Sequence, residues 1–364
     1  MLTTQVDVVV VGAGAMGSAT AWWLARRGHD VVLLEQFEAG HHRGSSHGGT
    51  RIFRHAYLDP HYVALAKEAL PLWRELEADA DETLLELTGA VDHGPAAVVQ
   101  ELAAALTGEH VAREVLRPEQ AAERWPGMRF DGVVLFHPEA GRCLADATVA
   151  ACQRRSAAHG ADVRFGTGPA SVTPSPTGER VVVATTDERW DARVAVVTAG
   201  AWVSRVLGGH VILPPLRVTL EQVQHFTPLD PTSAWPSFIH YRGEDLAVYG
   251  LETPGQGVKV DEHHVGAEVD PEAERVVDLD RRASVVRYVE DWFPGLDPTP
   301  RHEATCLYTS TPDQHFVVDR AGPIVVGSPC SGHGFKFTPL LGRMLADLAD
   351  GTVAHGDRRF ALPG

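Results

Sequence analysis

Cysteine is scarce in this chain of 364 residues, which contains only Cys143, Cys152, Cys306 and Cys330. Four widely separated thiols cannot form the dense disulfide framework of a small secreted protein, and they lack the paired spacing of a zinc ribbon. Histidine is commoner, with 19 residues, but the adjacent pairs at 41–42 and 263–264 would point to opposite faces of a strand. We therefore predict no metal site.

Basic residues are in the minority. The chain has 32 lysines and arginines against 48 aspartates and glutamates, which gives a formal net charge of −16. Nucleic-acid binding needs a basic surface that neutralises phosphates, so we do not expect a nucleic acid as a partner. This balance still allows a basic pocket for one small anion.

Long hydrophobic runs are also missing. No apolar segment is long enough to cross a bilayer, and the opening MLTTQVDVVVV lacks the basic start of a signal peptide. We therefore expect a soluble, cytoplasmic protein with no membrane partner. The length suits one large or two medium domains, and the 44% apolar and 22% charged content is typical of globular proteins. Length and the self-contained set of motifs favour a monomer.

Residues 6–36, VDVVVVGAGAMGSATAWWLARRGHDVVLLEQ, predict a dinucleotide-binding unit. An apolar strand leads into G-x-G-x-x-G, formed by Gly12, Gly14 and Gly17, and a helix and a second strand follow. The first glycine permits a tight turn, the second a close approach of a pyrophosphate, and the third the packing of helix on strand. Glu35 ends the second strand, where it would accept hydrogen bonds from a ribose, which favours NAD or FAD over NADP.

The next segment, GHHRGSSHGGTRIFRHAY at 40–57, does not continue the βαβ series of a plain NAD domain. Its glycine, serine and histidine content predicts an ordered loop that leads into a short helical or extended element. Ser45, Thr50 and Arg51 are candidate cofactor-binding residues within it. Arg51 and Arg54 lie three residues apart, and without further context they would be solvated surface arginines as readily as functional ones.

The rest of the chain alternates helices and strands and has no internal repeat. An apolar strand that ends at Gly200 is expected to return to the nucleotide-binding sheet, which places Gly200 at the cofactor. Residues 210–305 are richer in strand patterns and prolines, which indicates a mixed sheet. A final helix with Thr338 as its N-cap would offer a site for negative charge. Helical periodicity predicts helices over residues 63–77, 82–87, 96–106, 118–124, 146–159 and 339–350.

Five segments in one order give the chain a resemblance to the monomeric sarcosine oxidase and N-methyltryptophan oxidase family of flavin amine oxidases. The resemblance spans nearly the whole chain and implies the D-amino acid oxidase-like fold group with FAD as cofactor. The five segments are GAGAMGSATAWWLARRG near the start, GTRIFRHAY at 49–57, YGLETPGQGVKVDEHH at 249–264, CLYTSTPDQHF at 306–316 and SGHGFKF at 331–337.

The implied fold is α/β: a Rossmann-like FAD-binding domain with an inserted α+β substrate domain built on a mixed sheet. The two ends of the chain would then build one cofactor site. The expected FAD-binding domain is discontinuous and comprises residues 1–85, 140–212 and 306–364. The expected substrate domain comprises residues 86–139 and 213–305.

The resemblance also gives a role to one of the scarce cysteines. Family members attach the flavin 8α-methyl group to a cysteine just before a Tyr-Thr pair, and Cys306 occupies that position in CLYT. Without the motif, a small buried hydrophobe would be the simpler interpretation. Cys330 has no counterpart in the resemblance and is taken as a bystander. Gly332, Gly334 and Lys336 of SGHGFKF are expected on the cofactor side of the site.

Other roles follow from the same resemblance. Arg54 and Lys336 match the pair that holds a substrate carboxylate, which indicates an amino acid substrate and not a simple amine. Lys259 matches the lysine over the flavin that promotes reaction with oxygen. The remaining catalytic or substrate-contacting candidates are Tyr249 and His263 on the substrate side, Arg51 on the opposite flavin face, His333 near flavin and substrate, and Asp59 on a lid loop.

The predicted function is therefore an FAD-dependent oxidase of secondary (N-methyl or N-alkyl) α-amino acids, with molecular oxygen as the second substrate. Its products would be an imine, hydrolysed to an aldehyde and the primary amino acid, and hydrogen peroxide. One alternative is an oxidase of a cyclic imino acid such as proline or pipecolate. Others are a dehydrogenase with a different electron acceptor, against which Lys259 argues, and a nucleotide-binding protein without catalysis.

Overall fold

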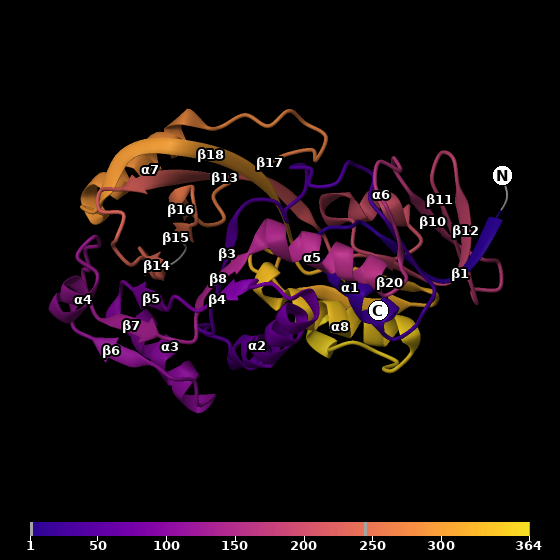
Figure 1. Ribbon diagram of the computed structural model, residues 1–364, viewed down its shortest axis with the longest axis horizontal. Coiled ribbons are helices and arrows are strands. Elements are labelled where there is room, and N and C mark those ends of the chain that lie inside the picture. The colour runs from indigo at the N-terminus through magenta and orange to yellow at the C-terminus, as the bar shows by residue number, and fades with distance from the viewer. Residues whose placement is uncertain (1–2, 244–245, 364) are drawn as a thin grey trace.

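The computed structural model describes residues 3–243 and 246–363, which form an elongated molecule with a separate sheet towards each end (Figure 1). Both termini lie at the end that holds β1, α1 and α8, and the strands of the central part of the chain lie at the other. None of the described helices is both long and apolar enough to cross a membrane.

The first sheet is the nucleotide-binding one, and its parallel centre is buried on both faces. Val8–Val11 of β1 are paired on one side with Val31–Leu34 of β2 and on the other with the end of β12. Such continuous valine and leucine runs are typical of parallel strands covered by helices. The strands are β1 (Thr3–Val11), β2 (Val31–Leu34), β9 (Asp162–Arg164), β10 (Ser171–Pro174), β11 (Val181–Ala184), β12 (Arg189–Val197), β19 (Val317–Ala321) and β20 (Ile324–Ser328).

Helices cover this sheet and connect it to the rest of the molecule. The apolar α1 packs against both α5 and α8, so segments from the start, middle and end of the chain share one core. Pro71 lies inside α2 without ending it. The helices near this sheet are α1 (Ala15–Arg26), α2 (Pro60–Ala80), α5 (Ala145–Ala158), α6 (Val203–Leu207) and α8 (Thr338–Asp350).

The second sheet is mixed and has nine strands, and its longest antiparallel pair is β13–β18. The helices α3 (Ala96–Gly108), α4 (Pro118–Arg124) and α7 (Leu279–Trp292) belong to this part of the molecule. Its strands are β5 (Ala90–His93), β6 (Glu114–Leu116), β7 (Val134–His137), β13 (Arg217–Pro228), β14 (Ser237–Tyr241), β15 (Ala247–Thr253), β16 (Gly257–Glu262), β17 (Ala267–Glu268) and β18 (Leu296–Ser310).

A small third sheet joins the two regions. It consists of β3 (Thr50–Phe53), β4 (Leu85–Glu86) and β8 (Gly141–Leu144). β3 also contacts β15 of the large mixed sheet and the 3-10 helix η2 (Phe335–Phe337). The arginine-containing segment, expected to be a loop that leads into a short helical or extended element, ends in the strand β3 between the two main sheets.

The α/β fold with a Rossmann-like unit and a separate mixed sheet is confirmed, but several local predictions are wrong. The helix expected over 82–87 is absent because Asp81 ends α2 in the left-handed conformation, φ 55°, and β4 follows. Thr338 is the first residue of α8 and not its N-cap, since its hydroxyl donates to the Phe335 carbonyl. The division into two domains stays a prediction, and its boundary at residue 306 falls inside β18, which continues to Ser310.

Candidate active site

One large cavity, about 1200 Å³ in volume, extends from the glycine motif of the first sheet to the mixed sheet. It brings together residues from almost every segment singled out in the sequence. The predicted site residues that line it are Gly12, Gly14, Glu35, Ser45, Arg51, Arg54, Gly200, Tyr249, Lys259, His263, Cys306, Gly332, His333, Gly334 and Lys336.

The dinucleotide end of the cavity is formed by the turn between β1 and α1. Gly12 has a φ of 100°, and a Cβ atom there would lie 2.6 Å from the Thr198 carbonyl oxygen, so only glycine fits. Gly17 lies in α1 outside the cavity lining, and a Cβ there would lie 1.9 Å from the Gly12 carbonyl oxygen. Its predicted part in packing helix on strand therefore agrees with its position. The Glu35 carboxylate accepts the backbone N–H groups of Ala13, at 2.9 Å, and Phe37, at 3.1 Å.

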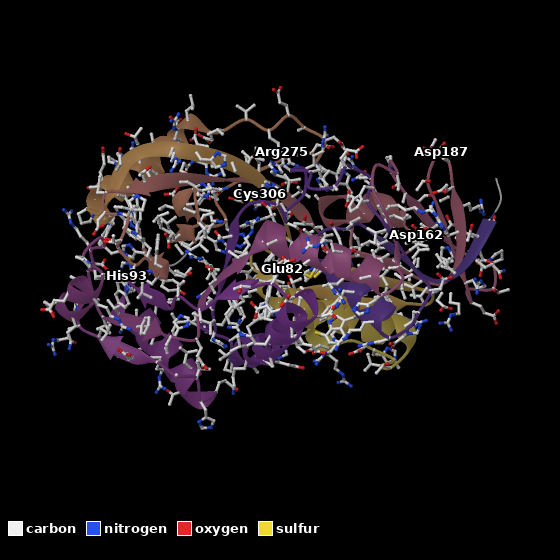
Figure 2. The ribbon with its side chains drawn as sticks, in the orientation of Figure 1. Glu82, His93, Asp162, Asp187, Arg275 and Cys306 are labelled. Carbon is white, nitrogen blue, oxygen red and sulfur yellow. The ribbon has the colours of Figure 1, made fainter. Side chains whose placement is uncertain are left out.

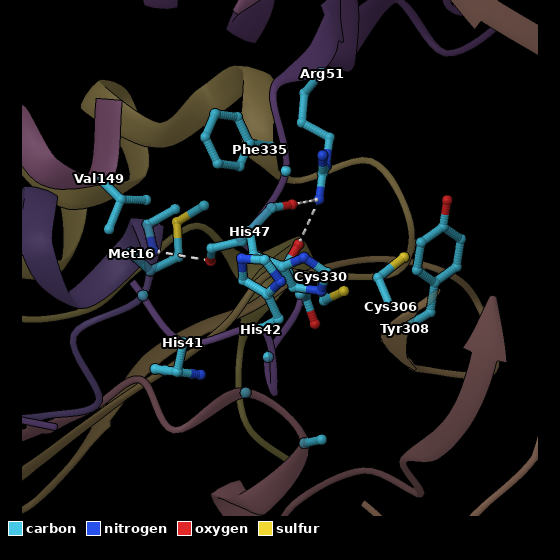
Figure 3. Close-up of a pocket in the computed structure, with 18 of the residues that line it drawn as sticks. Met16, His41, His42, His47, Arg51, Val149, Cys306, Tyr308, Cys330 and Phe335 are labelled. Carbon is cyan, nitrogen blue, oxygen red and sulfur yellow. Dashed lines mark hydrogen bonds between the residues drawn. The ribbon is translucent and has the colours of Figure 1, made fainter. Parts of the chain in front are cut away.

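Arg51 and Cys306 both line the cavity (Figure 3). Arg51 donates hydrogen bonds to the carbonyls of Thr50 at 2.8 Å, Ser45 at 2.9 Å and His47 at 2.7 Å, which fixes the loop before β3. Cys306 lies on β18 near the centre of the molecule (Figure 2). Burial raises the pKa of its thiol to about 11, although the nearby Arg51 acts in the opposite direction.

Lys259 is buried on β16, and its ammonium group has an unusual environment. Its Nζ donates to the Thr50 carbonyl at 2.6 Å, and among the described residues no carboxylate lies within 4.0 Å of it. Burial and the positive charge of Arg51 lower the pKa of Lys259 to about 7. Thr50 lies behind the cavity lining, where its side chain shares a 2.7 Å hydrogen bond with Thr253. Thr50 thus holds Lys259 in place through its backbone.

Arg54 directly follows β3, and its guanidinium group makes hydrogen bonds through one of its terminal nitrogens. Its Nη1 donates to the Ala56 carbonyl at 2.5 Å, to the Tyr241 hydroxyl at 3.1 Å and to Asp92 Oδ1 at 3.3 Å. All the hydrogen bonds that Arg54 makes within the described residues use this one nitrogen. Burial opposes the charge of Arg54, but Tyr241 and Asp92 outweigh it and raise its pKa above the ordinary value. The rest of the guanidinium fork remains available to a ligand in the cavity.

Lys336 lies on η2 and begins a chain of hydrogen bonds. Its Nζ donates to the Tyr57 hydroxyl at 2.8 Å and to the His333 carbonyl at 2.7 Å. His333 Nε2 lies 3.0 Å from the Gln314 carbonyl, which can only accept, so this nitrogen carries the proton. The Tyr57 hydroxyl therefore donates to His333 Nδ1 at 3.2 Å. Burial and the nearby Lys336 lower the pKa of His333 to about 3, so its ring is neutral.

Three aromatic side chains form one wall of the cavity. The His263 ring lies 5.7 Å from Tyr249 and 5.7 Å from Tyr308, both roughly edge-on. Burial lowers the pKa of His263 well below its ordinary value, so this ring is neutral as well. The wall thus presents neutral aromatic side chains to the cavity.

Asp59 departs from its prediction. It does not line the cavity: its side chain caps α2 by accepting the N–H of His61 at 2.9 Å, and it pairs with Arg359 at 2.6 Å. A helix-capping role explains an aspartate at this position. The structure therefore does not support substrate contact by Asp59.

Tyr57, Asp92 and Tyr241 belong to the site but were missed in the sequence. Tyr57 lies within GTRIFRHAY, so its motif was visible while its role was not. Asp92 and Tyr241 come from the neighbouring parallel strands β5 and β14, which are far apart in the sequence. Nothing in either segment indicated that they would meet at Arg54.

Residues 7–348 of the chain match the family described as "FAD dependent oxidoreductase". The chain belongs to this family. Its expected FAD cofactor and oxidoreductase class are thereby confirmed.

Full-length relatives agree with this assignment. The chain is 32% identical to the monomeric sarcosine oxidase of Bacillus sp. (strain NS-129), with 99% of this chain and 97% of that protein covered. It is 28% identical to the N-methyl-L-tryptophan oxidase of Yersinia pestis (strain Pestoides F), with 93% and 94% covered. Among solved structures, NikD, "an unusual amino acid oxidase essential for nikkomycin biosynthesis", superposes with a TM-score of 0.87 at 28% identity, covering 99% of this chain and 98% of that chain. The resemblance stated from the five segments is confirmed.

The cavity of this FAD dependent oxidoreductase fits its cofactor. Helix α1 opens onto the cavity at Gly14, has no acidic residue in its first turn and receives no cap from the side chain of its N-cap residue. Ser46 Oγ accepts the Ala15 N–H at 3.0 Å. Because the peptide dipoles of α1 add up along the helix, this end remains polar and positive. Such an end suits a pyrophosphate. Gly12, Gly14 and Glu35 would hold the adenosine diphosphate part of FAD. Arg51 and Cys306 would lie at its flavin ring system.

A histidine cluster on the mixed sheet tests the prediction of no metal site. His93, His240 and Asp131 have potential ligand atoms within 4.8 Å of one another. The two imidazole rings are stacked, with centroids 4.0 Å apart and planes inclined by 20°. Ligand lone pairs lie in the ring plane, so those of nearly parallel rings do not converge on one ion. The exposed Asp131 carboxylate instead lies 3.4 Å from one nitrogen of each ring and can accept hydrogen bonds from both.

Proposed function

We propose that this protein is an FAD-dependent oxidase of secondary α-amino acids that uses oxygen as electron acceptor and holds its flavin covalently through Cys306. One observation carries the proposal: Arg54 and Lys336, from distant parts of the chain, line the same cavity as the dinucleotide motif. The similarity to sarcosine and N-methyl-L-tryptophan oxidases supports it.

Arg54 and Lys336 would bind the substrate carboxylate. Both cations lie near the Tyr57 ring, Arg54 with its guanidinium carbon 4.8 Å and Lys336 with its Nζ 5.4 Å from the centroid. A guanidinium supplies a planar fork and an ammonium a point charge, so together they fix the orientation of a carboxylate. With that end fixed, the N-alkyl group points into the space bounded by Tyr249 and His263.

The rest of the chemistry depends on position and exclusion of water. FAD would supply the acceptor for the two electrons that the CH–NH group of the amine loses, together with two hydrogens, when it becomes an imine. The aromatic wall keeps the amine in a dry environment, which favours its neutral, oxidisable form. Lys259 places a cationic group where oxygen becomes negatively charged during its reduction to peroxide. Water then hydrolyses the imine product to an aldehyde and a primary amino acid.

A substrate panel tests the reaction class. Purified protein in air should release hydrogen peroxide with sarcosine, larger N-methyl amino acids, proline or pipecolate, and not with the matching primary amino acids. The size of the best substrate indicates how much space lies beside Tyr249. A preference for proline or pipecolate would indicate the cyclic imino acid alternative. Bleaching of the flavin without peroxide would point to a dehydrogenase and contradict the oxidase.

The covalent bond can be tested at Cys306, with Cys330 as a matched control because both thiols line the cavity. In the wild type and in Cys330→Ser, acid precipitation should leave the yellow flavin with the protein. In Cys306→Ser the flavin should appear in the supernatant, since no thiol is left at the attachment position. Retention of flavin in the Cys306→Ser precipitate would refute the proposed linkage, and its loss in Cys330→Ser would assign it to the other cysteine.

A further inference from the structure

The Lys336 side chain is a buried amine without a counter-ion. The residue is 6% exposed. Both hydrogen-bond partners of its Nζ are uncharged oxygens, the Tyr57 hydroxyl and the His333 carbonyl. Among the described residues no carboxylate lies within 4.0 Å of Nζ. A buried ammonium bears a large desolvation cost, which these two uncharged oxygens do not offset.

The groups that surround Lys336 do not supply negative charge either. Arg54 is positive and already faces Asp92. Burial raises the pKa of the Cys143 thiol and lowers those of the imidazoles of His263 and His333, so all three are neutral near pH 7. Burial raises the pKa of the Tyr57 hydroxyl, which therefore keeps its proton. Burial and Arg54 accordingly lower the pKa of Lys336 well below its ordinary value.

The number of acceptors matches a neutral amine. An ammonium has three N–H donors, whereas a neutral lysine has two and a lone pair. The structure provides two acceptors for Nζ, and the remaining direction belongs to the cavity that Lys336 lines. A bound carboxylate would supply both the third acceptor and the missing negative charge.

We propose that Lys336 is a neutral amine in the substrate-free enzyme and takes up one proton when a carboxylate binds, so that a zwitterionic amino acid gives its ammonium proton to Lys336. The nitrogen–hydrogen bond of the substrate ammonium breaks and one forms at Lys336 Nζ. The complex keeps its total charge, and the substrate keeps its carboxylate and becomes a neutral amine. This inference rests on the proposed function, because it requires an amino acid substrate.

The proton transfer would convert the substrate from its ammonium form to the neutral amine that can be oxidised. Amino acids are zwitterions near neutral pH, but an ammonium has no lone pair from which electrons can leave. Lys336 holds the released proton beside the carboxylate, where it strengthens binding, and not beside the reacting carbon. Carboxylate binding and amine deprotonation thereby become one coupled event.

The test uses butanoate, which has the shape of sarcosine with a methylene in place of the amine and therefore carries no exchangeable proton. Binding to the flavin-loaded enzyme at pH 8 is measured by calorimetry in buffers with different enthalpies of ionisation. We expect close to one proton taken up per butanoate bound in the wild type. Lys336→Arg, which is permanently charged, should bind butanoate with no proton uptake.

Lys259→Arg serves as the matched control, because Lys259 is the other buried lysine in the cavity and its pKa is about 7. This variant should still take up one proton. Butanoate binding without proton uptake in the wild type would overturn the inference and leave the carboxylate site intact. Uptake that persists in Lys336→Arg, or that is lost in Lys259→Arg, would assign the proton to another group. Failure of any carboxylate to bind would instead refute the proposed function.

Discussion

Replacement of Arg54 with methionine should lower kcat/KM for the best N-alkyl amino acid on the order of 100- to 1000-fold. The guanidinium offers the cavity a planar pair of donors, and methionine fills similar volume with none. The substrate carboxylate would then face Lys336 alone and lose its fixed orientation. Initial rates of peroxide release over a range of substrate concentrations measure the effect, and much of the loss should be in KM.

Two comparisons separate this role from a structural one. Arg54→Lys keeps the charge and should retain more activity than Arg54→Met, but less than the wild type because the fork is lost. A secondary amine without a carboxylate should be oxidised slowly and about equally by wild type and variant. If Arg54→Met lost activity towards both classes to the same extent, Arg54 would support the fold through Asp92 and not bind the substrate.

The parts of the fold that sequence predicted well are those set by local rules. The unit from β1 to β2 needs a buried strand, three glycines and a helix within about thirty residues, and each has its own sequence signature. The helix expected over 82–87 failed because no local pattern shows that Asp81 adopts a left-handed conformation. Leu85 and Glu86, which follow Asp81 in the sequence, then pair with Cys143 and Arg142 of β8, and that pairing cannot be seen in the local sequence.

The site divides in the same way. Arg54, Lys336 and Cys306 stand in recognisable segments, and the structure places all three around one cavity. Asp92 and Tyr241 carry no such signal, because their meeting depends on the parallel pairing of β5 with β14, in which Asp92 lies opposite Ile239. Asp59 shows the converse: its segment resembled a lid, but an aspartate just before Pro60 also suits a helix N-cap, and capping is its role here.

Within the part of the chain that the structure describes, the cavity contains two buried lysines with no acidic partner within 4.0 Å, Lys259 and Lys336, and a half-buried arginine with one, Arg54. The protonated form of each lysine is therefore stabilised most when a negative charge comes close to it. In the proposed reaction, that charge for Lys336 would be the substrate carboxylate, present from the start. For Lys259 it would be the charge that develops on oxygen during the second half-reaction. In both proposed steps, a buried lysine without an acidic partner would stabilise a negative charge in the cavity.

Replacement of Lys259 with methionine should slow reoxidation of the reduced enzyme by oxygen on the order of 100- to 1000-fold, since one preorganised electrostatic donor is lost. Reduction by the amino acid, measured separately by anaerobic stopped flow, should change little. Because the pKa of Lys259 is about 7, its charge and with it the reoxidation rate of the wild type should fall as the pH rises through 7. Lys259→Arg stays charged, so its rate should be insensitive to pH over this range. A wild-type rate that rises with pH, or a methionine variant that reoxidises normally, would place oxygen activation elsewhere, with Arg51 as the next cationic group in the cavity.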